Sequence, residues 1–176
     1  MHKLLDVEFL ARVPEVEPSF DVSPDGGRVA YTGNYTGRFE VYLLDLEQYT
    51  IRQLTNHARG ATCPRFSPDG RMLVTERPGR LRLVVDGRLL PEPVAGVPEV
   101  FARGQGGLLD VVPDPDFAAN GLIYLSYAHD DGTGRTTRVL CGRLDGAALT
   151  ESAVIFEGLP RTGGTNHFGS RLAFGP

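Results

Sequence analysis

The chain has 176 residues, with 18 basic and 22 acidic side chains, so its formal net charge is -4. This length suits one domain with a real core and is too short for two large ones. The interspersed charges leave no basic surface of the kind that binds nucleic acid, and no run approaches the roughly 20 apolar residues that cross a membrane. The 22 glycines, the 13 prolines and the lack of tryptophan favour many turns and short strands.

The N-terminal stretch is MHKLLDVEFLARVPEVEP, which lacks the apolar core of a signal peptide. As written, the chain is therefore expected in the cytoplasm. Within this stretch the run VEFLARVP has the apolar content of a single strand. We expect it to be a spare strand that precedes the first repeated unit.

A hairpin motif recurs along the chain. FDVSPDGGRVAYT (20–32) is repeated as PRFSPDGRMLVTE (64–76) and, more loosely, as LLDVVPDPDFAANGLIYLS (108–126). The turn prolines lie about 44 residues apart, which is the period of four-stranded propeller blades. In each copy an apolar strand leads into a tight turn that begins with Pro-Asp, and a second apolar strand follows. A fourth copy begins at RLAFGP, the C-terminal residues.

Two more strand-like runs follow each hairpin: FEVYLLDLE and TIRQLTNH, then RLRLVVDG and PEPVAGVP, then TRVLCGRLDG and TESAVIFEGLP. No window has the apolar spacing and caps of a helix. The sequence therefore predicts an all-β fold, a partial β-propeller of about three four-stranded blades plus a spare strand at each end. We expect the residues two before each turn proline to point into cores shared by neighbouring blades: Val22, Phe66, Val111 and Phe174.

No metal site is predicted from the sequence. Cys63 and Cys141 have neither metal-ligand spacing nor a disulfide framework, and we expect both to be small buried residues. The acidic run HDDGTGRTT (129–137) lacks the alternating ligands and the closing glutamate of a calcium loop. It is better explained as a solvated hairpin tip.

The chain carries two family resemblances. The first part, through FDVSPDGGRVAYTGN and FEVYLLDLEQYTIRQLTNH, resembles blades of the Tol-system periplasmic propeller and of prolyl-oligopeptidase-type peptidases. The second part, through SPDGRMLVTERPGRLRLVVDG, VFARGQGGLLDVVPDPDFAANGLIYLSYA and GGTNHFGSRLAFGP, more closely resembles the glucose/sorbosone dehydrogenase family. We place the boundary between 1–66 and 67–176, in the turn FSPDG that both parts share. The chain is interpreted as a chimera or fragment, natural or engineered, forming one continuous propeller segment.

The second resemblance implies roles for two residues. In that family a histidine in the segment like NHFGSRL takes the proton from the sugar's anomeric hydroxyl, and His167 stands there. A glutamine in the segment like GQGGLLDVV lies beside the quinone and the substrate, and Gln105 matches it. Imidazole, with an ordinary pKa of about 6.5, suits a base at neutral pH. Both residues precede a blade's first strand, which lines the central channel, so we expect them to converge. A purely structural role for His167 is the alternative.

The same resemblance implies the cofactors pyrroloquinoline quinone (PQQ) and calcium. The family takes its calcium ligands and the arginine over the quinone from blades that follow the NHFGSRL segment. This sequence does not contain those blades. We therefore expect the chain alone not to bind these cofactors.

Three functions stay open from the sequence. The first is a catalytically incomplete propeller fragment that folds and self-assembles, as a homodimer in which two chains close one six-bladed ring. The second is a PQQ-dependent aldose sugar dehydrogenase, an oxidoreductase, completed by a second chain. The third is a Tol-type protein-binding module. Neither nucleic acid nor a membrane is an expected partner, and both resembled families are typically periplasmic or secreted.

Overall fold

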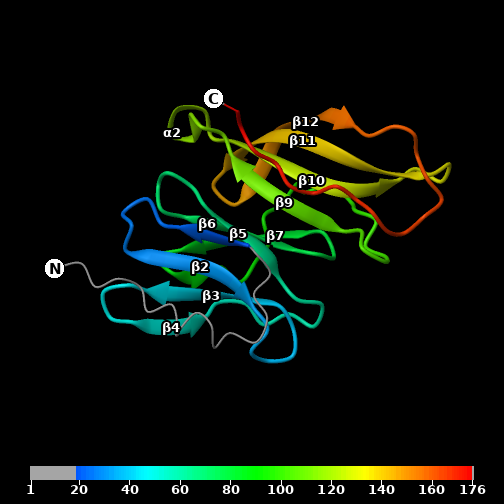
Figure 1. The fold of residues 1–176 in the computed structure, drawn as a ribbon. Coiled ribbons are helices and arrows are strands. Elements are labelled where there is room, and N and C mark those ends of the chain that lie inside the picture. Colours follow the sequence, from blue (N-terminus) through cyan, green and yellow to red (C-terminus); the bar gives the residue numbers. More distant parts are fainter. Residues whose placement is uncertain (1–18, 176) are drawn as a thin grey trace.

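The computed structural model describes residues 19–175, which form three four-stranded antiparallel sheets (Figure 1). The first sheet contains β1 (Phe20–Val22), β2 (Arg28–Gly33), β3 (Glu40–Asp45) and β4 (Thr50–Gln53). The second contains β5 (Thr62–Phe66), β6 (Met72–Glu76), β7 (Arg80–Val85) and β8 (Arg88–Leu89). The third contains β9 (Leu108–Pro113), β10 (Leu122–Asp130), β11 (Arg135–Asp145) and β12 (Ala148–Glu157).

In every sheet the strands are paired in chain order, as in a propeller blade. The predicted all-β partial propeller is therefore confirmed. The single helix among the described residues is one turn, α2 (Phe117–Asn120), which replaces the glycine turn in the third repeat. The spare strand predicted at VEFLARVP lies outside the described residues.

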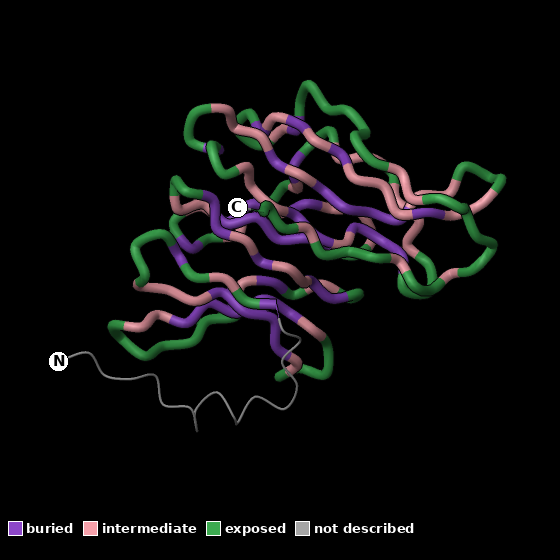
Figure 2. The backbone as a smooth tube through the Cα atoms, turned by 45° about the horizontal axis from the view of Figure 1, so that its top comes forward, coloured by how far each residue is buried: buried purple, intermediate pink, exposed green. Residues whose placement is uncertain are grey.

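Two cores hold the three sheets together. Because side chains alternate between the faces of a strand, each sheet offers one set of apolar residues to each neighbouring sheet. Figure 2 shows the buried stretches along strands of adjoining sheets and the exposed stretches at the loops. The core between the first and second sheets comprises Ala30, Val41, Leu43, Ala61, Phe66, Met72, Val74 and Val84. The core between the second and third comprises Leu73, Leu81, Leu83, Val94, Leu108, Val111, Phe117, Ile123, Leu125, Tyr127, Leu140, Leu144 and Leu149.

In each sheet, the connection between the first and the second strand contains an aspartate that accepts hydrogen bonds within that connection. The Ser23 hydroxyl donates to Asp25 Oδ1 at 2.5 Å and the Gly27 amide to the same oxygen at 3.0 Å. In the third sheet Asp114 accepts from the Asn120 side chain and from the Tyr124 hydroxyl, both at 2.9 Å. The bond from Ser23 lowers the pKa of Asp25, and the bond from Asn120 lowers that of Asp114.

Acid is expected to destabilise the fold through these turns. A carboxyl whose pKa is lower in the folded than in the unfolded chain adds stability above its ordinary pKa, and that stability is lost as the pH falls through the folded value. We expect the free energy of unfolding, measured by urea denaturation, to be level from about pH 7 to 5 and to decline below about pH 4. Asn120→Ala should make the decline shallower. A constant free energy down to about pH 2.5 would contradict this expectation.

Of the four side chains expected in the cores, two are there and two are not. Phe66 and Val111 are buried, which confirms the prediction for them. Val22 and Phe174 are 45% and 48% exposed, so the prediction was wrong for both. In β1 the residue that faces β5 is Asp21, whose Oδ2 accepts the Phe66 amide at 2.7 Å. The pleat therefore turns Val22 to the opposite face.

The C-terminal spare strand is also corrected by the structure. No strand follows β12 within the described residues, and residues 171–175 run over the third sheet instead, where the centre of the Phe174 ring lies 5.2 Å from that of the Tyr124 ring. Side-chain contacts hold them there, without a ladder of backbone hydrogen bonds. This segment is the red trace crossing β9 and β10 in Figure 1.

Two smaller expectations differ from the structure. The fourth strand of the second sheet is β8, and the segment PEPVAGVP that follows it makes one isolated bridge, from Ala95 to Ala148. Its prolines lack the amide hydrogens that a strand ladder needs.

Cys63 and Cys141 are free and half-buried, not fully buried. Cys63 lines a cavity, and Cys141 pairs with Ala153 of the exposed edge strand β12.

Candidate functional site

A cavity of about 490 Å³ lies where loops from all three sheets meet. The β2–β3 loop contributes Arg38, the β4–β5 loop contributes Arg59, and the β6–β7 turn contributes Arg77. Gln105 reaches it from the loop before β9, and Ser170 from the C-terminal segment. These connections lie at one end of the blades. Residues far apart in the sequence thus line one space, as the propeller architecture predicts.

The loop that carries Gln105 requires glycine on both sides. Gly104 has a φ of 57°, and a Cβ there would lie 2.3 Å from the Thr165 carbonyl oxygen. Gly107 has a φ of 151°, and a Cβ there would lie 2.3 Å from the Arg77 carbonyl oxygen. Such contacts exclude any side chain without a backbone shift. The glycines of the RGQGG segment therefore let this loop lie directly against its neighbours.

The backbone of His167 meets the side chain of Gln105, but the two side chains line different cavities, so the predicted convergence on one pocket is met only in part. The His167 amide donates to Gln105 Oε1 at 2.8 Å, and the Gln105 amide donates to the Thr165 carbonyl at 2.8 Å. His167 has a φ of 67°, a left-handed conformation that a non-glycine residue adopts only when neighbours hold it. The Gln105 side chain thus fixes the backbone of the histidine segment. Whether Gln105 and His167 take the roles that the resemblance implies stays a prediction.

The imidazole of His167 is exposed and faces a second cavity, also of about 490 Å³. Arg135 and Phe168 line this cavity as well. The Arg135 guanidinium donates to Asp130 Oδ2 at 2.8 Å and to the Gly163 carbonyl at 2.5 Å, and it lies 4.5 Å from the centre of the Phe101 ring. It thereby anchors the loop that leads to His167.

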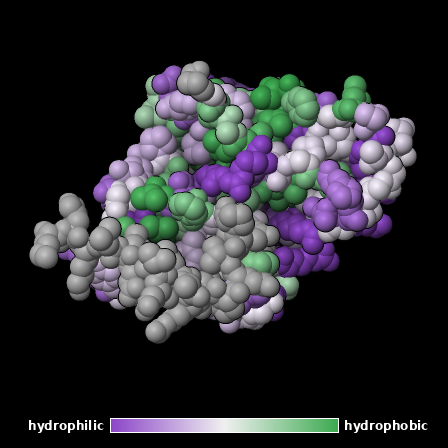
Figure 3. Space-filling view, viewed as in Figure 1, coloured by the Kyte–Doolittle hydropathy of each residue, from purple (hydrophilic) through white to green (hydrophobic). Residues whose placement is uncertain are grey.

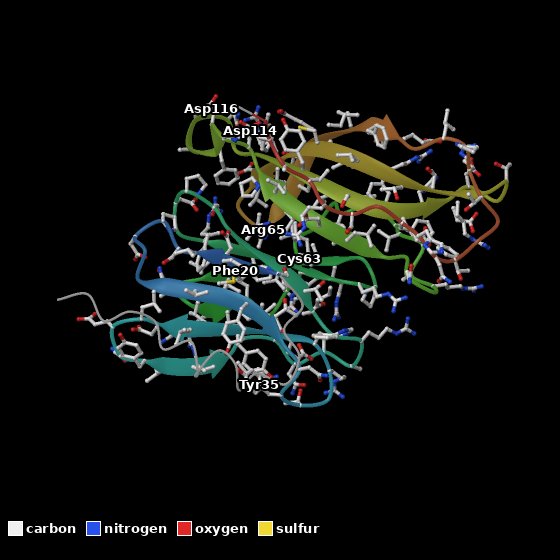
Figure 4. All side chains as sticks on the ribbon, viewed as in Figure 1. Phe20, Tyr35, Cys63, Arg65, Asp114 and Asp116 are labelled. Carbon is white, nitrogen blue, oxygen red and sulfur yellow. The ribbon has the colours of Figure 1, made fainter. Side chains whose placement is uncertain are left out.

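The residues that follow His167 are held by Asp110, which the sequence did not single out. Asp110 on β9 is buried, and its Oδ2 accepts the Leu172 amide at 3.1 Å. Its own amide donates to Ser126 Oγ, whose hydroxyl donates to the Ser170 carbonyl at 2.6 Å. Asp110 Oδ1 lies 3.5 Å from Nη2 of Arg65, which Figure 4 shows between the second sheet and β9. An aspartate within an otherwise apolar strand was the one available signal.

The described residues do not include a group of three His, Cys, Asp or Glu side chains that could hold a metal ion. The run 129–137 forms the tip of the β10–β11 hairpin, where Asp131 is exposed and is bonded to Thr133. Hydrogen bonds from Thr133 lower the pKa of Asp131 to about 2. Within residues 19–175, helices are too short to reach across a lipid bilayer.

Replacing Gln105 by alanine is expected to loosen the His167 backbone. One exposed hydrogen bond contributes about 1 kcal/mol, so amide exchange at His167 should become about fivefold faster. Hydrogen exchange followed by NMR measures this effect. Gln48→Ala, in the exposed β3–β4 turn, is the matched control and should leave the exchange at His167 unchanged. Equal exchange in the Gln105 variant and the parent would show that the hydrogen bond from the His167 amide to Gln105 does not hold the loop.

Comparison with known proteins finds relatives of the part of the chain that carries Gln105 and His167. The family model described as "Glucose / Sorbosone dehydrogenase" matches residues 61–176. The aldose sugar dehydrogenase YliI of Escherichia coli is 47% identical over 114 residues, covering 62% of this chain and 30% of its own length. The soluble aldose sugar dehydrogenase from Escherichia coli in the apo-form superposes with a TM-score of 0.59 at 44% identity, covering 63% of this chain and 33% of that one. The PQQ-bound aldose sugar dehydrogenase of Streptomyces coelicolor has a TM-score of 0.52 at 25% identity, with coverages of 70% and 36%.

A second likeness covers a larger share of the chain. A putative TolB from Agrobacterium tumefaciens superposes with a TM-score of 0.55 at 22% identity, covering 81% of this chain and 50% of that one. This likeness concerns the propeller fold alone. The chain spans about 30% of the length of the curated relatives that it matches.

Proposed function

The chain belongs to the glucose/sorbosone dehydrogenase family, and from this membership we propose that it is the part of an aldose sugar dehydrogenase propeller that carries the proton-accepting histidine. The contact between the His167 amide and Gln105 Oε1 supports this proposal most directly, because it brings together the two residues that the family resemblance selects. The residues that hold this contact all lie within the family match.

In the proposed reaction an aldose is oxidised to its lactone: the anomeric carbon gives up a hydride and the anomeric hydroxyl gives up a proton. Bound PQQ would supply the acceptor of the hydride. The exposed imidazole of His167 would take the hydroxyl proton, for which a neutral ring is suited near pH 7. Gln105 would keep the imidazole in place by accepting a hydrogen bond from the His167 backbone amide. The NH2 group of its side chain would remain available to a ligand in the first cavity.

We propose that this chain alone does not hold the full cofactor set. The first cavity offers arginine and amide groups that suit an anionic quinone. Residues 19–175 gather no set of three carboxylate or imidazole ligands for the calcium ion. We therefore assign the remaining contacts to residues beyond this chain, either further blades or a second copy.

A dye-linked sugar oxidation assay with added PQQ and calcium tests the assignment. The chain alone is expected to show little or no turnover. Joined to the part of the Escherichia coli enzyme that follows the matched segment, it should turn over aldoses, and His167→Ala should lower the rate about 100-fold or more. His57→Ala, a histidine outside both cavities, is the control. A joined protein that keeps its rate without the His167 imidazole would refute the role of this residue.

Self-assembly is a second proposed property, and exposed apolar side chains favour it. On edge strand β12, Val154, Ile155 and Phe156 are 46%, 57% and 55% exposed, and on β1 Phe20 is 61% exposed. Figure 3 shows hydrophobic side chains gathered on the surface over the third sheet. We propose that two copies close one six-bladed ring, in which a first sheet from outside the family match has been joined to family blades as a chimera.

Light scattering coupled to size exclusion measures the proposed dimer. The expected mass at micromolar concentration is twice 19.1 kDa. Phe156→Lys should shift the population to monomers because it places a charge on the apolar edge. A soluble, folded monomer of the parent chain would rule the dimer out.

A further inference from the structure

The outer face of the first sheet, which is turned away from the second sheet, is apolar. Ala30 and Leu43 belong to the core shared with the second sheet. Because side chains alternate along a strand and opposed residues share a face, their neighbours form two cross-strand rows on the outer face. One row is Phe20, Tyr31, Tyr42 and Gln53, and the other is Val22, Val29, Leu44 and Ile51. Apart from Gln53, every member is aromatic or aliphatic.

A buried cluster lies at the centre of this face. Tyr31, Tyr42 and Leu44 are 5%, 5% and 2% exposed, and Val29 and Leu46 pack against them. All five belong to the first sheet or to the turn after β3, and the core shared with the second sheet contains none of them. A sheet with a second apolar face needs a second layer to cover that face.

The rim of the face differs from its centre. Phe20 and Val22 on β1 are 61% and 45% exposed, and Ile51 on β4 is 37% exposed. The Tyr35 ring, whose centre lies 4.7 Å from that of the Tyr42 ring, covers part of the tyrosine row. Burial on β2 and β3 with exposure at both edges indicates a cover that is narrower than the sheet.

The sequence that leads into β1 has the pattern of such a cover. It has 18 residues before Ser19, and every second residue of VEFLARV (7–13) is apolar: Val7, Phe9, Ala11 and Val13. This alternation is typical of a strand with one apolar face, and the charges of Glu8 and Arg12 lie on the other. Four strands span about 14 Å, and a strand of the length of 7–13 extends about 23 Å. The segment can therefore cross the face, with residues 14–18 left to connect it to β1.

We propose that residues 7–13 cover the centre of the outer face of the first sheet in the same chain, with their apolar side against Tyr42 and Leu44. Burying an apolar face of this kind is favourable, and a segment joined to β1 meets it at a high effective concentration. Phe20 lies outside this cover and remains available to the proposed dimer contact. The inference therefore goes beyond both the sugar oxidation and the dimer and rests on neither.

Tryptophan fluorescence tests the proposal, because the chain contains no tryptophan of its own. Phe9→Trp places a reporter on the apolar side of the segment, and Leu10→Trp places one on the opposite side at the next residue, which makes it the matched control. In the full chain the Phe9→Trp reporter is expected to emit at shorter wavelength and to be quenched by acrylamide several-fold less than the Leu10→Trp reporter. Circular dichroism verifies that both variants are folded.

A change on the sheet should reach the reporter. Combined with Phe9→Trp, Tyr42→Ala is expected to move the emission to longer wavelength and to raise the quenching toward that of Leu10→Trp. Tyr49→Ala is the control, because this tyrosine is 49% exposed in the β3–β4 turn, outside both rows. It should leave the emission unchanged. The comparison of the two reporters alone decides the matter if Tyr42→Ala does not fold.

Dilution separates a contact within one chain from a contact between two copies. From micromolar to nanomolar concentration the emission of the Phe9→Trp variant should stay the same, because a contact within one chain does not depend on concentration. Loss of the shielding on dilution would assign the strand to a second copy and overturn the proposal. It is also overturned if the two reporters emit and are quenched alike, or if a folded Tyr42→Ala variant leaves the Phe9→Trp reporter unchanged.

Discussion

Leu125→Ala is expected to lower the free energy of unfolding by about 3 kcal/mol. Leu125 is fully buried on β10, the second strand of the third sheet, where it pairs with Val111 of β9 and Leu140 of β11. All three belong to the core between the second and third sheets. Alanine would remove buried methyl groups and leave a cavity that rigid neighbouring strands cannot fill.

Urea denaturation followed by circular dichroism measures this loss. Thr150→Ala provides the control because Thr150 lies on β12 of the same sheet, is exposed, and is not part of the apolar edge. It should change the free energy of unfolding by less than about 0.5 kcal/mol. Equal effects of the two substitutions would mean that the core between the sheets does not hold the third blade in place.

The repeated hairpin made the fold readable from the sequence. Turn prolines at a steady interval, each followed by aspartate, fixed the number of blades and the start of each one. These turns could be predicted from the sequence because they are held by local hydrogen bonds: Asp25 and Asp114 are each bonded within their own turn. The strands near such turns need no information from distant residues to form.

Contacts between blades were harder to predict. The side to which Val22 points depends on Asp21 meeting the Phe66 amide in the next sheet, and residue pattern alone does not show that bond. The path of RLAFGP depends on Asp110 and Tyr124 in the sheet beneath it. Gln105 and His167 were found because the segments GQGGLLDVV and NHFGSRL resemble the glucose/sorbosone dehydrogenase family. By contrast, the bond between them is a tertiary contact that the sequence pattern left open.

Asp110→Asn is expected to lower the free energy of unfolding by about 3 kcal/mol and to release the segment that carries His167. Three donors face the carboxylate: the Arg65 guanidinium at 3.5 Å, the Val111 amide at 3.0 Å and the Leu172 amide at 3.1 Å. Asparagine has nearly the same shape, but its NH2 group would face one of these donors. Arg65, whose side chain is 13% exposed, would also keep a charge without its partner.

Two measurements separate this effect from a general loss of stability. Amide exchange at Leu172 should accelerate more than exchange at Leu43 in the first sheet, because only Leu172 loses its acceptor. Combining Asp110→Asn with Arg65→Gln should cost less than the sum of the two single changes, since the pair is lost only once. Asp145→Asn, at the exposed β11–β12 turn, is the matched control. If Asp110→Asn proved as mild as this control, Asp110 would not be what fastens the histidine segment to the third sheet.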